Sequence, residues 1–278
     1  MISNLLLSEK EFFKKNGYLI LKNTFKKNEI NDLIFKIKKT FNIDHLSDSE
    51  ICKSKKSYKL TDGVTKTNLL WSLIYNDTII KTIKSIYDDD ICYAQHSDLH
   101  INNRGGRWHR DSRCRVFGKG TDWDEAKVKY GIVRVAIYLS DFKTSNSSVI
   151  IFPRSHKFEN FFQKFEFRLI NKIISFLKKY NIQEYFPNFS ITRKLVKHDT
   201  NAGDILIFDQ RVVHGSGNIG ISKKIPKYSI FLAYGLNNKH TINHKKYYVD
   251  EKDLDYQKTI DPELLNILRN NKLDFLYK

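Results

Sequence analysis

The feature that most constrains the fold is a series of short β-type segments that begins near residue 91. Each segment is rich in Val, Ile, Tyr or Phe, and Gly, Asn or Ser residues separate it from the next. The segments span residues 91–95, 131–139, 148–153, 203–209 and 228–235. Several short strands with turn residues between them are typical of a sandwich or a barrel, so we expect a mainly β core with flanking α-helices.

The chain before residue 91 has mostly helical patterns. An alternating strand is predicted over 17–23, and a helix follows it because Ile30, Leu33 and Ile37 recur at helical spacing. A further helix is predicted over 67–86. Each of these elements is expected to flank the β core.

The domain organisation is predicted to be simple. The 278 residues contain no linker rich in Pro, Gly or Ser and no internal repeat. We therefore expect one domain over 1–278, with a helical N-terminal part over about 1–90 and a β core over about 91–240.

One stretch interrupts the β core, and we expect a helical insertion over about 158–190. Apolar side chains recur at helical spacing in its first part, namely Phe158, Phe161, Phe162, Phe165, Leu169, Ile173 and Phe176. We predict that this apolar face packs on the β core. A lid, a dimer surface and a membrane-surface helix are the alternatives.

Charge and cysteine content narrow the choice of partners. The net charge is +17, but the excess comes from scattered Lys rather than from basic runs, so we do not expect a nucleic-acid partner. The three Cys have no metal-type spacing and are too few for a disulfide framework. No apolar run is long enough to span a membrane and the start does not have the pattern of a signal peptide, so a cytoplasmic location is expected.

Two His-x-Asp pairs are candidate metal ligands, because residues two apart on a strand share a face. They are His96 with Asp98 and His109 with Asp111. A later histidine, His214, follows the strand-like segment 203–209 and precedes small residues. Two His and one carboxylate on a β scaffold are typical of the facial triad of non-heme iron(II) oxygenases, whereas zinc more often takes three His or Cys.

Several blocks, in order, resemble the phytanoyl-CoA dioxygenase-like family of iron(II)/2-oxoglutarate-dependent oxygenases. They read FFKKNGYLILKNTFKKNEINDL, WHRDS, VRVAIYLSDF with VIIFPRSHK, and GDILIFDQRVVHGSGN. The resemblance implies a double-stranded β-helix of the jelly-roll or cupin type. It also implies His109, Asp111 and His214 as iron ligands and Ser216 near 2-oxoglutarate, with O2 as the other cosubstrate. His96 and Asp98 then either contact substrate or cosubstrate, or are ordinary polar residues of a half-buried strand.

The family's arginine for the distal carboxylate of 2-oxoglutarate has no counterpart here. The matching segment reads KKIPKYS, and Lys227 stands where the family has this arginine. Lysine offers a point charge without the two-pronged geometry of a guanidinium, so hydroxyl groups would assist it. Lys223 and Lys224 are the alternatives if the register differs, and Lys227 as a solvated strand end is the other interpretation.

Five of the eleven Arg crowd around the proposed iron pair, at positions 104, 107, 110, 113 and 115. Guanidinium groups suit phosphate and carboxylate oxygens. Strand alternation would place Arg107 and Arg113 on the side of His109, so both are candidates for binding an anionic substrate. Ion pairs with Asp122, Asp124 and Glu125 are the alternative.

The sequence therefore predicts a 2-oxoglutarate-dependent dioxygenase that hydroxylates a small, anionic metabolite and releases succinate and CO2. Desaturation or demethylation at the same iron is one alternative, and a non-catalytic β-helix protein that binds an anionic ligand is another. A nucleic-acid dealkylating oxygenase is not favoured, because no paired Arg follows His214.

Overall fold

The computed structural model describes residues 6–103, 107–112, 128–141, 148–180, 189–216, 225–250 and 255–274. Its larger sheet comprises β1 (Tyr18–Leu21), β2 (Tyr58–Thr61), β3 (Ile91–Tyr93), β4 (Asp98–Ile101), β5 (Ile132–Tyr138), β8 (Ile205–Asp209) and β10 (Tyr228–Leu236). The strand order is β1-β8-β5-β10-β4-β2, with β3 also paired to β10, and every pair is antiparallel. The β-type segments predicted from the sequence thus form strands of one sheet, except 148–153.

A smaller sheet faces the larger one. It contains β6 (Ser148–Ile151), β7 (Val196–Asp199) and β9 (His214–Ser216) in the order β7-β6-β9, again antiparallel. The strands β2, β7 and β9 have no apolar alternation, and the sequence did not predict them.

Helices complete the structure. They are α1 (Leu7–Asn16), α2 (Lys27–Thr40), α3 (Asp48–Ser54), α4 (Gly63–Lys66), α5 (Asp77–Tyr87), α7 (Phe161–Lys179), α8 (Lys239–Asp250) and α9 (Pro262–Asn270), with a 3₁₀-helix, η1, at Asn68–Leu73. No helix within the described ranges is both long and apolar enough to cross a membrane.

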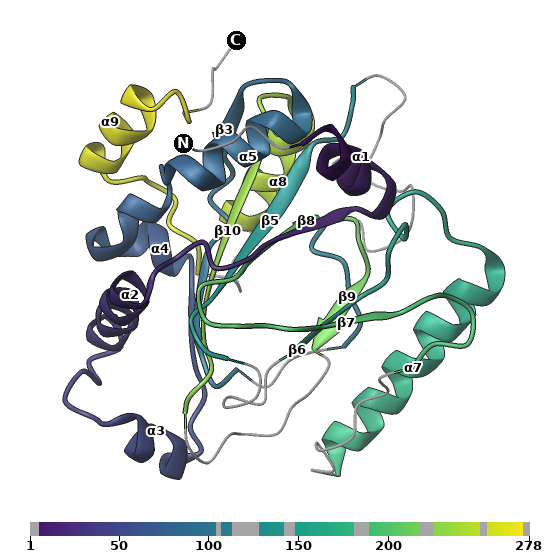
Figure 1. The fold of residues 1–278 in the computed structure, drawn as a ribbon, viewed down its shortest axis with the longest axis horizontal. Coiled ribbons are helices and arrows are strands. Elements are labelled where there is room, and N and C mark those ends of the chain that lie inside the picture. The colour runs from purple at the N-terminus through teal and green to yellow at the C-terminus, as the bar shows by residue number, and fades with distance from the viewer. Residues whose placement is uncertain are drawn as a thin grey trace.

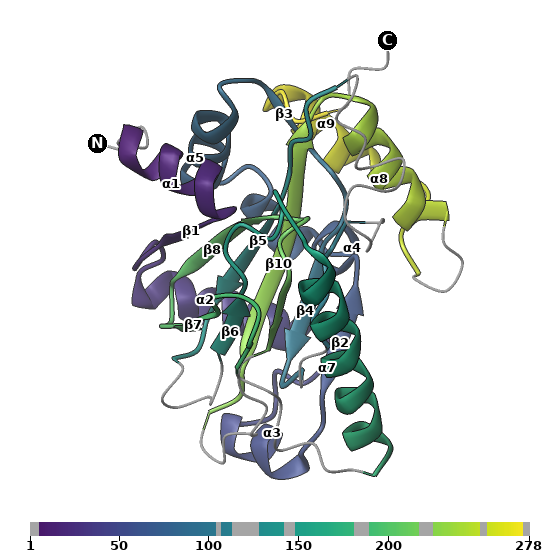
Figure 2. The same cartoon turned by 90° about the vertical axis from the view of Figure 1, so that its right-hand side faces the viewer.

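The larger sheet is covered on both faces, which explains why β5 is buried along its whole length. Val135 of β5 belongs to a core cluster with Ile37 of α2 and Ile83 of α5. The next residue, Ala136, points to the opposite face and packs with Ile151 of the smaller sheet. Figure 1 shows these layers in order, from α2 through the long strands and the smaller sheet to α7, and Figure 2, turned by 90°, shows α7 in front of the larger sheet.

The prediction of one helix over 67–86 is wrong in one respect, because this segment forms two helices. It forms η1 and then α5, and Asn76 separates them. The Asn76 side chain accepts hydrogen bonds from the backbone N–H groups of Thr78 and Ile79, at 3.1 and 3.2 Å. This N-cap satisfies donors that a continuous helix would have bonded internally, so a new helix begins there.

The insertion is helical as predicted, but the predicted packing face is wrong. The side chains of α7 that reach the core are Phe167, Ile170 and Ile174, which pack with Trp108 and Phe152. The expected core residues are instead largely exposed: Phe158, Phe161, Phe162, Phe165, Leu169, Ile173 and Phe176. Both sets recur at helical spacing, so periodicity alone does not distinguish the two faces.

Candidate metal centre

Two histidines from distant parts of the chain are paired through their backbones. His214 lies on β9, and the N–H group of His214 and that of His109 each donate to the other's carbonyl, both at 2.9 Å. β9 is in turn fixed by β6, where His214 pairs with Ile151. The pairing brings the two imidazole rings side by side, with their centroids 4.2 Å apart.

A carboxylate completes a group of three. Asp111 Oδ1 lies 3.5 Å from His109 Nε2 and 3.7 Å from His214 Nε2. One ligand atom from each of the three side chains lies within 4.8 Å of the others, so the group could hold a metal ion. It is the one such group within the described residues.

Backbone carbonyls orient both imidazoles. His109 Nδ1 donates to the carbonyl of Arg107 at 2.8 Å, and His214 Nδ1 donates to that of Val212 at 3.1 Å. A carbonyl only accepts, so the proton of each neutral ring lies on Nδ1 and the lone pair on Nε2. This arrangement is typical of metal-binding histidines, whose second nitrogen is fixed by a hydrogen bond.

The charges of the group suit a cation. Burial by itself would raise the pKa of the Asp111 carboxyl, but His214, His109 and Arg134 lower that pKa well below its usual range. Burial, together with His109, lowers the pKa of His214 to about 4, so this imidazole is neutral at physiological pH. The site therefore offers a metal ion one anionic oxygen ligand, from Asp111, and at least one neutral nitrogen ligand, from His214.

Arg134 connects the metal group to the interior of the larger sheet. This buried residue of β5 donates to Asp98 Oδ2 of β4 at 2.6 Å and to the carbonyl of His96. Its Nε lies 3.9 Å from Asp111 Oδ2 and has no hydrogen-bond partner. One guanidinium thus faces two carboxylates, the buried one of Asp98 and the largely buried one of Asp111.

A second polar group lies on the same face of the sheet. Lys227 immediately precedes β10. Ser229 lies two residues later, so the two side chains point to the same face of the sheet. The Lys227 N–H donates to Asn102 Oδ1 at 3.0 Å, and the Asn102 N–H donates to the Lys227 carbonyl at 2.9 Å. Ser229 Oγ and Asn102 Nδ2 are buried without partners, and Lys227 has no ion pair in the described part of the chain. Burial lowers the pKa of Lys227 to about 8.

The alternative pair, His96 and Asp98, is buried but forms no group of three ligands with described residues. His96 Nδ1 lies 3.2 Å from His244 Nε2 of α8, and its ring stacks on Tyr248 at 3.8 Å. Asp98 binds Arg134. The strand that carries Asp98 is therefore more deeply buried than the sequence predicts.

The arginines of the cluster have different environments. The segment 107–112 contains a single bridge at His109 and is not a strand, so the alternation on which their sides were predicted does not hold. Arg110 is buried and binds Glu159 at 2.9 Å. Arg107 is exposed and lines a shallow cleft of about 610 Å³ with side chains of α7 that include Arg168 and Lys172. Among the described residues, no Asp or Glu lines this cleft.

Other predicted residues are only partly placed. Ser216 lies on β9 two residues after His214, and its side chain is outside the described part. Lys223, Lys224, Arg104, Arg113 and Arg115 also lie outside the described residues, as do the acidic residues proposed to pair with the cluster.

The sequence reasoning missed several residues of the site, among them Ser229, Arg134 and Tyr248. Ser229 stands two residues after Lys227, a spacing visible in KYS. Arg134 is the one charged residue in the apolar run GIVRVAIYL, and such an isolated charge indicates a buried partner. Tyr248, whose hydroxyl donates to the Asp111 carbonyl at 3.1 Å, comes from a polar segment that gave no signal.

Comparison with known proteins now decides the family. The family profile of the phytanoyl-CoA dioxygenases (PhyH) matches residues 13–220, most of the chain and all three residues of the metal group. The chain belongs to the phytanoyl-CoA dioxygenase family. The enzyme class that the sequence predicts, a 2-oxoglutarate-dependent oxygenase, is thereby confirmed. A search of curated proteins gave no match.

Solved structures of PhyH-like enzymes share the fold. The carbocyclase SnoK from nogalamycin biosynthesis superposes with a TM-score of 0.58 at 14% identity, covering 84% of this chain and 85% of SnoK. HygX from Streptomyces hygroscopicus gives 0.58 at 13% identity, with 84% and 88% covered. EctD from S. alaskensis gives 0.56 at 14% identity, with 84% and 77% covered. The predicted double-stranded β-helix is thus confirmed.

The environment of Arg134 yields a prediction for stability. Arg134→Met should lower the free energy of unfolding by about 3–5 kcal/mol, because it leaves Asp98 and Asp111 buried without their shared cation. Urea denaturation at neutral pH measures this loss. Asp98→Asn combined with Arg134→Met should cost less than the sum of the two single changes. If Arg134→Met lowers the free energy of unfolding by less than about 1 kcal/mol, Arg134 is not the main partner of these carboxylates.

Proposed function

We propose that the PhyH oxygenase described here binds iron(II) through His109, Asp111 and His214 and hydroxylates a small, anionic metabolite. The observation that carries the proposal is the orientation of the three ligand atoms, with both imidazoles fixed through Nδ1 and the carboxylate ionised. Two His and one carboxylate on one side of an ion leave its other positions for a keto acid and O2. This complete ligand set favours an enzyme over a non-catalytic binding protein.

The neighbouring polar group suits 2-oxoglutarate. A carboxylate placed at Lys227 would meet an ammonium group and the unpartnered donors Ser229 Oγ and Asn102 Nδ2. Ser216, on β9, is the proposed further contact. HygX was crystallised with nickel and 2-oxoglutarate, and EctD with 2-oxoglutarate and 5-hydroxyectoine, which supports the same ligands for this chain.

When bound, iron and 2-oxoglutarate with O2 supply an oxidation in which one oxygen atom enters succinate, formed with CO2, and the other enters a substrate C–H bond. The protein's own residues fix the geometry of this reaction. The backbone pairing of His109 with His214 aligns two ligands, and the Tyr248 hydroxyl holds the carbonyl of the third, Asp111. His214, His109 and Arg134 together lower the pKa of Asp111 and keep its carboxylate ionised.

The cleft that Arg107 lines supports an anionic substrate. Arg107 lies two residues before His109, and the described lining also includes Arg168 and Lys172 of α7 and contains no acid. Each charge-assisted hydrogen bond to a substrate carboxylate or phosphate would contribute about 1.5–3 kcal/mol. Arg113, whose surroundings are not described, stays a second candidate for the same role.

The metal assignment is tested by removing single ligands. His109→Ala, Asp111→Ala and His214→Ala should each lose most iron binding in anaerobic dialysis and all release of succinate, while circular dichroism shows an unchanged fold. His96→Ala is the matched control, because His96 is a buried histidine of the same region outside the group, and it should keep its iron. Iron retained in His109→Ala but lost in His96→Ala would move the site to the other pair.

The assignment of Lys227 predicts a pH dependence. The free protein loses the Lys227 proton near pH 8, and the neutral amine no longer attracts the carboxylate. The affinity for 2-oxoglutarate should therefore be about tenfold weaker at pH 9 than at pH 7, by calorimetry on the nickel-loaded protein. Lys227→Arg should flatten this profile, since a guanidinium stays protonated throughout. A steep profile in Lys227→Arg would assign the dependence to another group.

The substrate role of Arg107 is tested once turnover is found in a screen of acyl-CoA thioesters, amino acids, phosphonates and sugar nucleotides. Arg107→Ala should raise KM for the substrate about tenfold or more and leave substrate-independent decarboxylation of 2-oxoglutarate unchanged. Lys56→Ala removes an exposed cation remote from this cleft and serves as control. A neutral substrate, or equal loss of both activities, would contradict the proposal.

A further inference from the structure

The outward face of α7 is unusually apolar. Phe161, Phe162, Phe165 and Phe176 are between 59% and 75% exposed, and Leu169, Ile173 and Tyr180 extend the same surface. We call these seven residues the aromatic stripe. Exposed side chains of this size are expected singly on a protein surface, whereas a contiguous group indicates a binding surface.

The stripe is not the face of α7 that packs on the protein core. The opposite face of α7 is packed through Phe167, Ile170 and Ile174. Polar groups also fix it, since Glu166 accepts from the hydroxyl groups of Ser190 and Thr192, and Asn171 donates to the Trp108 carbonyl. The helix is therefore anchored with the stripe pointing away from the core. Its 19 residues extend for about 28 Å.

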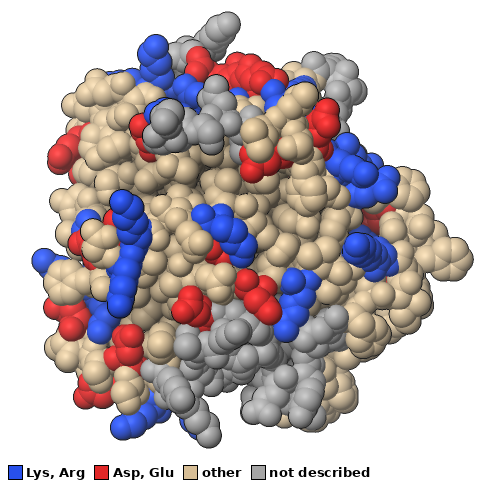
Figure 3. Space-filling view, viewed as in Figure 1, with Lys and Arg blue, Asp and Glu red and all other residues tan. Residues whose placement is uncertain are grey.

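The charges on α7 are all of one sign on the exposed side. Lys164, Arg168, Lys172 and Lys179 are exposed among the aromatic residues. The two described acids of this region point inward, because Glu159 binds Arg110 and Arg193, and Glu166 binds the segment after the helix. Figure 3 shows an uncharged surface at the right-hand edge, where α7 lies in Figure 1, with Lys and Arg side chains beside it.

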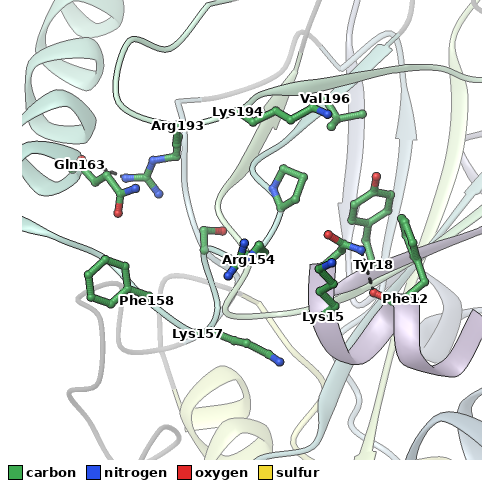
Figure 4. Close-up of a pocket in the computed structure, with 13 residues that line it drawn as sticks. Phe12, Lys15, Tyr18, Arg154, Lys157, Phe158, Gln163, Arg193, Lys194 and Val196 are labelled. Carbon is green, nitrogen blue, oxygen red and sulfur yellow. Dashed lines mark hydrogen bonds between the residues drawn. The ribbon is translucent and has the colours of Figure 1, made fainter.

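A basic cleft adjoins the beginning of this helix. Its volume is about 630 Å³, and its cations are Lys15, Arg154, Lys157, Arg193 and Lys194. No Asp or Glu is among its described lining residues. Figure 4 shows Arg154 in the middle of the cleft, with Lys15 and Lys157 near it and Phe158 beside α7. Lys157 and Phe158 thus connect the cleft to the stripe.

The backbone at the centre of the cleft is also unusual. Arg154 has a φ of +68°, a conformation that side chains with a Cβ rarely adopt. Its N–H donates to the carbonyl of Asn16 at 3.0 Å, which ties the cleft to the end of α1. Fixed in this way, Arg154 is presented between two elements rather than on a free loop.

We propose that this face docks on the surface of an anionic lipid bilayer. The aromatic stripe would enter the boundary between headgroups and acyl chains, and the cations of α7 and of the basic cleft would contact lipid phosphates. A helix with aromatic residues and Lys or Arg on its exposed side is typical of helices that lie in the membrane interface. This surface lies outside the metal group, but it shares Arg168 and Lys172 with the cleft proposed above for the substrate, so the variants below change neither residue.

A second copy of the chain fits this face less well. In a two-fold contact the same patch meets itself, so the four cations of α7 would lie opposite their own copies. Like charges placed together oppose association, and the net charge of +17 adds to the repulsion. An anionic surface instead gains from both the stripe and the cations.

Vesicle flotation with the full chain tests the proposal. The wild type should bind vesicles of phosphatidylcholine and phosphatidylserine in equal parts, bind phosphatidylcholine vesicles weakly, and lose binding in high salt. The combined variant Phe161→Ser, Phe162→Ser and Phe176→Ser should weaken partitioning about tenfold or more, because it removes three large apolar side chains. Thermal unfolding should be unchanged, since all three are exposed.

Matched variants separate the electrostatic contribution to vesicle binding from the apolar one. Arg154→Gln with Lys157→Gln should weaken binding to the anionic vesicles about tenfold and reduce its salt dependence. Phe35→Ser and Lys39→Gln change exposed residues on α2 and should have no effect. The proposal is overturned if the wild type fails to bind anionic vesicles or if the triple Phe variant binds them normally. It is also overturned if the wild type is a dimer that the triple variant converts to a monomer, which would assign the stripe to a second copy.

Discussion

The metal group depends on one pair of backbone hydrogen bonds, those between His109 and His214. These residues are more than a hundred positions apart, and the pairing fixes both their separation and the direction of their side chains. β9 is short, and it is held because it pairs with β6, whose Ile151 packs in turn against the larger sheet. The core between the two sheets therefore determines the geometry of the ligands. Asp111 joins them through its own backbone bond to Gln210.

Burial of charge is the second constraint on the interior. Asp98, Asp111 and Arg134 lie between the sheets, where an isolated charge would be costly, so the three side chains must be ordered together. Lys227 has no such partner among described residues, and its pKa is lowered accordingly. An incoming carboxylate would supply the missing charge. The same region thus contains an ion pair within the protein, between Arg134 and Asp98, and a cation, Lys227, that can bind a carboxylate of a ligand.

Much of the fold could be predicted because β5, β8 and β10 are apolar runs and the blocks around His109 and His214 occur in the family's order. Other parts could not. β7 and α8 have polar sequences. The buried His244 and the half-buried Tyr248 contact His96 in a way that no local pattern encodes. α7 has two apolar faces with the same period, and only tertiary packing selects Ile170 and Ile174 for the core. The sides of Arg107 and Arg110 could not be predicted from strand alternation, because the described segment 107–112 has only an isolated bridge at His109 and is not a regular strand.

The most direct test of this account is a crystal structure of the protein loaded anaerobically with iron(II) and 2-oxoglutarate. The account predicts an ion bound by Nε2 of His109, Nε2 of His214 and the carboxylate of Asp111. It also predicts that the distal carboxylate of 2-oxoglutarate lies against Lys227 and Ser229. An ion bound by His96, Asp98 or His244, or a cosubstrate carboxylate held away from Lys227, would contradict it.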